Sequence, residues 1–329
     1  MAARLLAPAA DIYGTLAARR MAQPPRDTSA LPVLCIGNFT AGGTGKTPLA
    51  IWLAERLKVL GLAPAILTRG YGSPVRVPTL VDLHRHTAID VGDEALLLAR
   101  AAPVMVSPDR AAGARAIAAG EIRADVIVMD DGLQNPALAK DLTIAVVDGV
   151  RGFGNGYVIP SGPLRAPLRQ QLAKTDVVVV NGRREDRDAL AVELAGSFSG
   201  PILAAWPEPS TDISWLRGAR VLAFAGIGNP DRFFRMLERL GATLVGERKF
   251  SDHHIFSQTE AVGLLSDAQQ CDALLVTTEK DFVRLGAGQA QDALRHAVRA
   301  VPIAMVFGDG AEKVLMARVE DALARRRPV

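Results

Sequence analysis

The sequence predicts an α/β protein: a three-layer sandwich around a mostly parallel sheet, followed by a smaller α/β domain toward the C-terminus. Short apolar runs rich in β-branched residues end in Gly or Asp, a pattern typical of buried parallel strands. Segments with helical periodicity alternate with these runs, as they do in successive βαβ units. A second alternating series begins after Gly218, which indicates that the C-terminal part forms its own sheet.

The elements of the first series follow from local composition. A helix is expected from about 47 to 60, directly after the first strand, and an Ala-rich helix follows the third strand and ends near Gly120. The expected strands are residues 33–37, 63–68, 103–107, 124–132, 142–149 and 176–182. These runs are mainly apolar and bounded by Gly or Asp, as buried parallel strands are, so helices are expected on both faces of the sheet.

The second series consists of a strand from 220, a helix in FFRMLERLG, the strand TLVGERKF, a helix around 258–270 and a strand at 273–278. The Pro-punctuated run 201–209 and the run 301–307 flank this series. We expect these two runs to pair as a hinge that returns the C-terminal helix to the first domain. The resulting division is an N-terminal amphipathic helical segment at 1–30, a domain at 31–200 and a smaller domain at 201–329.

Composition narrows the classes of function. The formal charge of +3 and the pI near 9.0 suit an anionic substrate or an acidic membrane surface. Scattered arginines and an aromatic content of 5% argue against a nucleic-acid-binding protein. Cys35 and Cys271 lack metal-ligand spacing and indicate no disulfide framework, which favours a reducing cytosol. No feature of the sequence points to an obligate protein partner.

The N-terminal segment is basic and amphipathic, and it has too little continuous apolar length for a signal peptide. Its apolar and basic side chains are Arg4, Leu5, Leu6, Ile12, Tyr13, Leu16, Arg19, Arg20 and Met21. Such a helix lies either in the headgroup layer of a membrane or on the protein's own core, and the sequence leaves both readings open. Pro8 is expected to break or start this helix, not to lie in its middle. Nowhere does the chain reach 18 consecutive apolar residues, so no helix is expected to span a bilayer.

A glycine-rich loop follows the first strand in VLCIGNFTAGGTGKTP. Its glycines let the backbone N–H groups face an anion, and Lys46 would reach the β- and γ-phosphates of a nucleotide while the Thr47 hydroxyl binds Mg²⁺. The nucleotide-binding stretch is therefore Thr40, Ala41, Gly42, Gly43, Thr44, Gly45, Lys46 and Thr47. The loop differs from the usual G-x-x-x-x-G-K-[ST] pattern in having Thr40 at its first glycine. The dimeric cytoskeletal type of ATPase needs a lysine where this chain has Ala41, which argues against that class.

Acidic residues occur at two places suited to metal-dependent phosphate chemistry. Asp130 and Asp131 end the strand VIVMDD, where an acid holds Mg²⁺ in P-loop enzymes. Asp93 and Glu94 begin a helix in GDEALLLA, where the residues alone favour a simple helix cap.

Two further motifs carry basic side chains. The Pro- and Gly-rich SGPLRAPLR places Arg165 and Arg169 in a loop suited to binding phosphate oxygens. In FSDHHIF, His253 and His254 follow an acid; a metal-ligand role and an acid–base role are both open, although no third metal ligand stands at a usual spacing. TEKD at 278–281 is only a loose echo of a guanine-binding signature, so ATP is favoured over GTP. The residues alone thus predict a Mg-ATP phosphotransferase with a basic acceptor site.

The motifs GNFTAGGTGKTP, RGYG, GDE, DDGLQ, PSGPLR, FSDHH and TEKD occur in the order found in the tetraacyldisaccharide 4′-kinases of lipid A synthesis. The chain resembles that family over nearly its whole length, and the family characteristically has Ser or Thr at the position of Thr40. The resemblance implies a P-loop NTPase-like kinase that transfers the γ-phosphate of ATP to the 4′-hydroxyl of a tetraacylated disaccharide 1-phosphate, forming lipid IVA. It also implies peripheral association with the cytoplasmic face of the bacterial inner membrane. The alternatives are a P-loop kinase of another alcohol and a nucleotide-driven switch ATPase.

The resemblance also implies roles for single residues. Asp93 matches a general base, Arg165 a charge-stabilising arginine and Tyr71 an aromatic residue near the nucleotide or substrate. Glu94, Asp130 and Asp131 match an acidic metal cluster, with either aspartate as the closer Mg²⁺ ligand. One of His253 and His254, preferably His253, would pair with Asp93 from the second domain. The chain departs from many members at Asn135, where they have His, and at Ala166, where they have Glu.

Overall fold

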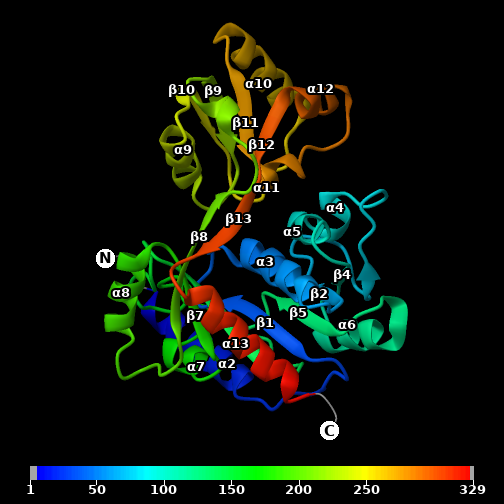
Figure 1. Cartoon of the computed structure of the whole chain (residues 1–329), viewed down its shortest axis with the longest axis vertical. Coiled ribbons are helices and arrows are strands. Elements are labelled where there is room, and N and C mark those ends of the chain that lie inside the picture. Colours follow the sequence, from blue (N-terminus) through cyan, green and yellow to red (C-terminus); the bar gives the residue numbers. More distant parts are fainter. Residues whose placement is uncertain (1–5, 327–329) are drawn as a thin grey trace.

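The computed structural model of the protein describes residues 6–326. The larger of its two sheets forms the base of the molecule (Figure 1). It has nine strands in the order β13-β8-β7-β6-β1-β5-β2-β4-β3. They are β1 Val33–Asn38, β2 Pro64–Thr68, β3 Thr79–Leu80, β4 Val104–Val106, β5 Val126–Asp130, β6 Leu142–Asp148, β7 Val177–Asn181, β8 Ile202–Pro209 and β13 Ile303–Phe307. Pairing is parallel from β8 to β4, and only the two edge strands β13 and β3 run antiparallel to their neighbours. The expected α/β fold with a mostly parallel sheet is thereby confirmed.

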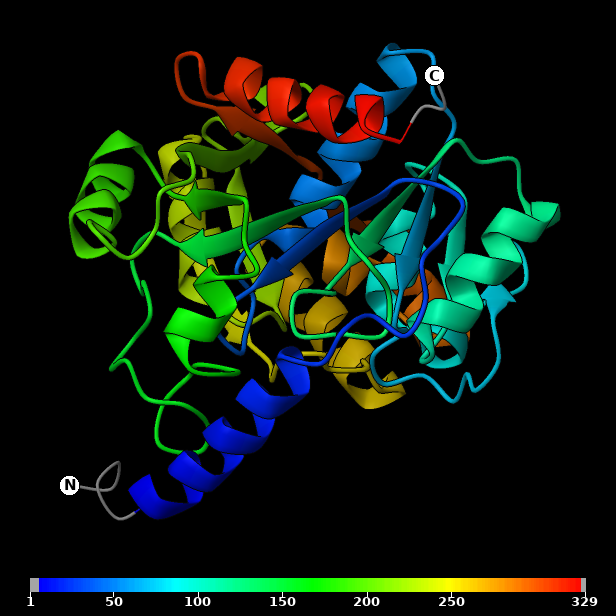
Figure 2. The same cartoon turned by 90° about the horizontal axis from the view of Figure 1, so that it is seen from below.

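Helices cover both faces of this sheet because successive strand residues point to opposite sides. Leu34 and Ile36 of β1 pack with α3 (Lys46–Val59), α5 (Asp93–Leu98) and α13 (Ala311–Ala324). Val33 and Cys35 pack on the other side with α6 (Arg110–Ala116) and the π-helical turn Ile117–Glu121. The remaining helices beside the sheet are α4 (Ala88–Val91), α7 (Leu168–Leu172) and α8 (Arg184–Glu193). Figure 2 shows α13 on one side of the sheet and the N-terminal helix on the other.

The smaller sheet has four parallel strands in the order β10-β9-β11-β12. They are β9 Arg220–Ala225, β10 Thr243–Lys249, β11 Leu274–Thr278 and β12 Val298–Val301. The helices around it are α9 (Pro230–Arg239), α10 (Gln258–Gln270), α11 (Glu279–Phe282) and α12 (Gln289–Ala297), with a 3₁₀ turn at Ser214–Leu216. Below, the small lobe means residues 220–301, and the large lobe means residues 6–209 and 303–326.

The sequence interpretation of the run 301–307 as one strand is wrong at its first residues. Val301 is the last residue of β12 in the small sheet, whereas Ile303 begins β13 in the large one. Pro302 lies between them, and it has no N–H to continue a ladder. The strand β12 was not foreseen, because its residues Val298–Val301 include an Arg and lack a clear apolar run.

Two long strands connect the lobes (Figure 1). β8 enters the small lobe and β13 leaves it, and they pair antiparallel, with Met305 opposite Pro207. The chain then continues into α13, whose Leu315 and Val319 are fully buried in the core of the large lobe.

The N-terminal helix α2 (Ala7–Met21) begins with Pro8 in its first turn, as expected. Its small Gly14 lies against Val158 and Pro167, so one side of the helix docks on the protein. The other side exposes Ile12, Tyr13 and Leu16 by 65%, 44% and 59%. Figure 2 shows α2 projecting from the body of the molecule. Arg4 and Leu5 lie outside the described residues, and among those described no helix is long and apolar enough to cross a bilayer.

Candidate active site

The glycine-rich loop connects β1, the central strand of the large sheet, to the N-terminus of α3. Gly42 and Gly45 have φ of +103° and +96°, a region that residues with a Cβ rarely adopt. Lys46 is the first residue of the helix, and its side chain is only 10% exposed. The loop therefore presents backbone N–H groups, a helix N-terminus and one lysine at a single place, the combination that binds nucleotide phosphates.

Two asparagines hold the loop in this shape. Asn38 at the end of β1 donates from Nδ2 to the Thr40 carbonyl at 2.7 Å. Asn181 at the end of β7 donates from Nδ2 to the Thr44 carbonyl at 2.9 Å. A Cβ on Gly45 would lie 2.5 Å from that same Nδ2, so only glycine fits beside Asn181. Both supports come from strand ends, and sequence reasoning identified neither of them.

Asp130 ends β5, the neighbour of β1, and Asp131 follows it, so both lie next to the loop. Asp131 accepts a hydrogen bond from Arg165 Nη1 at 2.7 Å, and its Oδ1 is 3.6 Å from Lys46 Nζ. Burial raises the pKa of Asp131, but the charges of Lys46 and Arg165 lower it below its ordinary value. Arg165 reaches this position because its backbone N–H donates to the Phe39 carbonyl at 2.8 Å, which ties the Pro-rich loop to the end of β1.

Asp130 is in a different environment from its neighbour. It is 1% exposed, and Thr68 Oγ1 donates to its Oδ2 at 3.1 Å, while Oδ1 has no hydrogen-bond partner. Burial and the nearby charges of Glu94 and Asp131 raise the pKa of Asp130. A buried carboxylate oxygen without a donor, close to two further acids, is a favourable environment for a cation.

Asp93 begins α5 on the side of the large lobe that faces the small lobe. The turn before it requires Gly92, whose φ is +90° and whose Cβ would lie 3.0 Å from the Tyr71 carbonyl. Asp93 is 6% exposed, and its Oδ1 accepts from the Glu94 N–H at 2.9 Å. Its Oδ2 meets His253 Nδ1 at 3.2 Å and Arg284 Nε at 2.6 Å, and both of these side chains belong to the small lobe.

The electrostatic balance at Asp93 favours the carboxylate form. Burial alone would raise the pKa of this group. The hydrogen bond with His253 and the positive charges of Lys280 and Arg284 outweigh burial and hold the pKa well below its ordinary value.

The two adjacent histidines have separate surroundings. His253 has a positive φ of +61° and turns its ring toward Asp93, 5.4 Å from the ring of Tyr71. His254 instead stacks on Phe250 with ring centroids 4.8 Å apart, and its Nε2 lies 3.0 Å from Glu260 Oε1. The structure therefore brings His253 to Asp93 and leaves His254 in the packing of the small lobe.

The three acids expected to form a metal cluster are not gathered into a cage. Glu94 forms an ion pair with Lys280 Nζ at 3.0 Å, and Lys280 is another small-lobe residue. Within residues 6–326 the structure contains no group of three or more His, Cys, Asp or Glu side chains arranged to hold a metal ion. Glu94 and Asp131 are each paired with a cation of the protein, and their role with Asp130 in an acidic metal cluster remains a prediction.

Further contacts between the lobes surround the loop. Arg232 of α9 donates from Nη2 to Asn181 Oδ1 at 2.8 Å. Arg151 Nη2 donates to the Gly228 carbonyl at 3.3 Å, and a Cβ on Gly228 would lie 3.3 Å from the Gly43 nitrogen. The turn after β9 thus lies directly against the glycine-rich loop, so any nucleotide bound there would meet both lobes.

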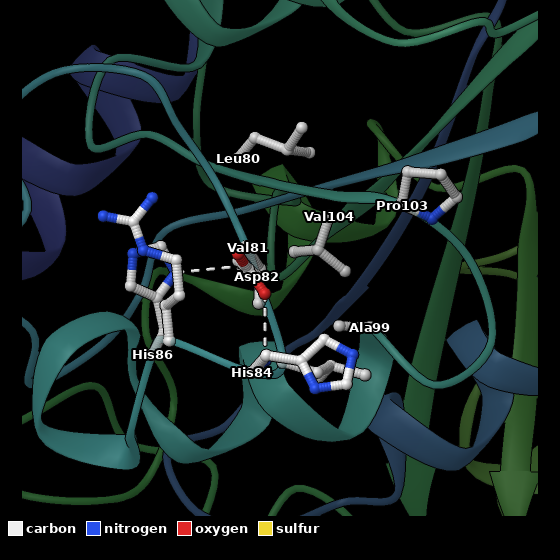
Figure 3. A pocket seen from close by; sticks show the side chains of 10 residues that line it. Leu80, Val81, Asp82, His84, His86, Ala99, Pro103 and Val104 are labelled. Carbon is white, nitrogen blue, oxygen red and sulfur yellow. Dashed lines mark hydrogen bonds between the residues drawn. The ribbon is translucent and has the colours of Figure 1, made fainter.

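A cavity of about 560 Å³ lies apart from these residues, at the β3 edge of the large sheet (Figure 3). Its wall includes Leu80, Val104 and the side chains of His84 and His86. Figure 3 shows the two histidines on either side of Asp82; the Asp82 N–H donates to His86 Nδ1 at 3.1 Å, and the His84 N–H donates to Asp82 Oδ1 at 2.9 Å. These contacts are internal to the loop, and the cavity contains none of the site residues expected from the sequence.

A lysine-ended phosphate loop after the central strand of a parallel sheet, with acids after the neighbouring strand, defines a P-loop nucleotide-dependent enzyme. The family model described as Tetraacyldisaccharide-1-P 4′-kinase matches residues 2–323, so the chain belongs to that family.

Relatives and a solved structure agree with this assignment. A tetraacyldisaccharide 4′-kinase of Nitrobacter hamburgensis is 47% identical over 328 residues, which are 98% of this chain and 95% of the relative. One of Methylorubrum extorquens is 52% identical over 285 residues, 87% of this chain and 86% of the relative. The crystal structure of LpxK from Aquifex aeolicus in complex with ATP has a TM-score of 0.74 at 23% identity, covering 98% of this chain and all of the other. That likeness supports the same fold.

Proposed function

We propose that this protein is a tetraacyldisaccharide 4′-kinase, which transfers the γ-phosphate of ATP to the 4′-hydroxyl of a tetraacylated glucosamine disaccharide 1-phosphate. The product is lipid IVA, an intermediate of lipid A synthesis. Family membership and the names of the relatives support the reaction. The structural observation that carries the proposal is the position of the Asp93–His253 pair, which is made by two lobes that also meet at the phosphate loop.

The nucleotide contacts follow from the geometry of the loop. The backbone N–H groups of residues 40–45 and the start of α3 would surround the β- and γ-phosphates, and Lys46 would neutralise them. Arg165, held beside Asp131, would add charge where it develops on the transferred phosphoryl group. Tyr71 is 67% exposed beside His253, and we assign it to the nucleotide or the acceptor sugar.

A divalent cation, Mg²⁺, would neutralise charge on the phosphates during transfer. Thr47 and Asp130 are the residues that fit it best, since Asp130 Oδ1 is buried without a hydrogen-bond donor. Asp131 and Glu94 complete the acidic set, and each would have to exchange a lysine or arginine partner for it. Mg²⁺ usually keeps several waters and phosphate oxygens as ligands, so a complete protein cage is not required.

In the chemical step the 4′-hydroxyl oxygen attacks the γ-phosphorus, and the bond to the β–γ bridging oxygen breaks. The Asp93–His253 pair takes the proton that leaves the hydroxyl. A carboxylate held at a low pKa is a weak base, but the loose transition state of phosphoryl transfer gains more from orientation than from basicity. Because His253 comes from the small lobe, the pair is complete only when the lobes meet. We propose that β8 and β13 act as the hinge for that movement.

His253→Ala is expected to lower kcat by about 10- to 100-fold, because it removes one half of the Asp93–His253 pair. The matched variant His254→Ala removes the adjacent imidazole, which stacks on Phe250 and reaches Glu260. It should lower the melting temperature while leaving kcat within about twofold. Steady-state kinetics and thermal unfolding of both variants check this. A larger kcat loss in His254→Ala would reverse the assignment of the two histidines.

The exposed face of α2 supports peripheral binding to a membrane surface, which we place at the cytoplasmic face of the bacterial inner membrane. Ile12 and Leu16 would enter the interface, and a pI near 9.0 favours anionic lipid.

Ile12→Glu/Leu16→Glu is expected to weaken binding to anionic phospholipid vesicles about tenfold or more. Val192→Glu on α8 is the control, since Val192 is an equally apolar side chain and 78% exposed. Equal loss in both proteins, measured by vesicle co-sedimentation, would contradict the assignment of α2.

The decisive experiment is transfer of radiolabel from [γ-³²P]ATP with Mg²⁺ to tetraacyldisaccharide 1-phosphate in detergent micelles. The control contains ATP and detergent without the acceptor. Label in a lipid product, with little hydrolysis in the control, is the expected result. Hydrolysis without transfer would favour a nucleotide-driven switch ATPase. Binding of ATP with neither signal would indicate a kinase of another alcohol.

A further inference from the structure

The helix α11 and the turn after it bring two cations to the two consecutive acids of α5. Lys280 lies in α11 and Arg284 in the turn after it. Lys280 pairs with Glu94, and Arg284 contacts Asp93 through Nε and Nη2. The segment includes TEKD, a motif that the mechanism above does not use.

The guanidinium of Arg284 forms hydrogen bonds within the small lobe as well as with Asp93. Its side chain is 1% exposed, and Nη1 donates to the Gly226 carbonyl at 2.5 Å and to Asp281 Oδ1 at 3.1 Å. Asp281 is itself fixed by the Gly226 N–H at 3.0 Å and the Thr278 hydroxyl at 2.7 Å. Side chains with this many fixed partners have little freedom to adjust. Arg284 is therefore a rigid part of the small lobe that ends on a carboxylate of the large lobe.

We propose that Arg284 is a positioning residue for Asp93, supplied by the small lobe, and that it aims the carboxylate at the acceptor hydroxyl when the lobes meet. The inference deepens the proposed kinase function and rests on it.

The hydrogen bonds at Asp93 show which acceptor site of its carboxylate is left for the substrate hydroxyl. An ionised carboxylate has about two acceptor sites on each oxygen. Arg284 and His253 both occupy Oδ2, and the Glu94 N–H occupies one site on Oδ1. The remaining acceptor site is on Oδ1, and a hydroxyl hydrogen-bonded there would complete the carboxylate. Without Arg284 the carboxylate would rotate, and Oδ2 would compete with Oδ1 for the same hydroxyl.

A second ion pair between the lobes provides the control for closure alone. Arg100 Nη1 contacts Glu279 Oε1 at 3.1 Å, and this pair joins the same two segments without touching Asp93. The Arg100 side chain is 46% exposed. Exposed pairs of this kind contribute little to stability, so Arg100→Gln should leave the protein folded.

The test is steady-state transfer of γ-phosphate by Arg284→Gln, Arg284→Lys and Arg100→Gln. Misplacement of a catalytic group by about 1 Å can cost about 100-fold in rate, and we expect a kcat loss of about that size for Arg284→Gln, with KM for ATP unchanged. Arg284→Lys retains the positive charge and should recover part of the loss. Arg100→Gln should keep kcat within about twofold. In an Asp93→Asn background, Arg284→Gln should cause no further loss, because it acts only through the carboxylate.

Several results would overturn the inference. Additive losses in the double variant would mean that Arg284 acts independently of Asp93, for example on the substrate itself. A rise in KM for ATP at unchanged kcat would make it a nucleotide-binding residue. If Arg284→Gln does not fold, the same cycle is measured with Arg284→Lys, and unchanged kcat in that variant alone would count against a role that depends on the guanidinium. A wild-type protein that fails to phosphorylate the acceptor would instead refute the proposed kinase function.

Discussion

Lys46→Ala should reduce phosphate transfer by about 1,000-fold. Removing one preorganised charge or hydrogen-bond donor from a developing transition state typically costs about 100- to 1,000-fold in kcat, and Lys46 would contact the transferred group itself. The affinity for ATP should fall as well, because the same ammonium would neutralise the bound phosphates. The variant is expected to fold, since its partner Asp131 keeps the hydrogen bond from Arg165. Transfer kinetics and ATP titration calorimetry measure the two effects.

Lys58→Ala is the matched control for this change. Lys58 lies in the last turn of the same helix and is exposed at the end away from the loop. It should leave both kcat and ATP affinity within about twofold. Unchanged activity in Lys46→Ala would end the assignment of residues 40–47 as the phosphate site.

The sequence predicts the fold and the shape of the expected phosphate loop, because both depend on local patterns. The buried strands are mainly apolar runs, and the loop between β1 and α3 is recognised from contiguous residues. Asp130 and Asp131 lie at the strand end that the sequence predicts, at the same edge of the sheet as the loop, and their metal role remains a prediction. Strand ends shifted by one or two residues, as at Pro302, where the chain passes from one sheet to the other.

Local sequence patterns do not predict contacts between segments that are far apart in the chain. Asn181 supports a loop that is 137 residues earlier in the chain, and Arg284 meets an aspartate 191 residues away. A polar residue that ends a strand, or an arginine one turn after a strand, is common in any sequence. Only the arrangement of the two lobes gives these residues their roles. The pairing of His253 with Asp93 also depends on the two lobes, because His253 contacts Asp93 of the large lobe whereas His254 stacks on Phe250 within the small lobe.

One side of α2 docks on the protein, and membrane binding by the other side remains a prediction. Gly14 docks on Val158 and Pro167, whereas Ile12 and Leu16 are exposed. A helical pattern shows that one stripe is apolar, but it does not show which stripe meets the protein. The residue types of the expected acidic metal cluster also do not show which other side chains contact them. Lys46 and Arg165 pair with Asp131, and Lys280 pairs with Glu94.

Asp93→Asn should lower kcat by about 100- to 10,000-fold while ATP binding stays near the wild-type value. The amide has the shape of the carboxylate but cannot take the proton from the acceptor hydroxyl, and positioned acid–base groups contribute a factor of this size. The proposed nucleotide contacts come from the loop between β1 and α3, not from α5, so the substitution leaves them unchanged. The site should remain folded, because the buried guanidinium of Arg284 keeps Asp281 as a charged partner.

Asp90→Asn tests whether this effect belongs to the position or to any carboxylate nearby. Asp90 is exposed three residues before Asp93, and its side chain accepts only from Thr87, at the start of α4. An amide oxygen can still accept those bonds, so kcat should change by no more than about twofold. Parallel loss of kcat and ATP affinity in Asp93→Asn would place Asp93 in the nucleotide site. Loss of kcat alone would leave the carboxylate with the acceptor, at the point where the small lobe supplies His253 and Arg284.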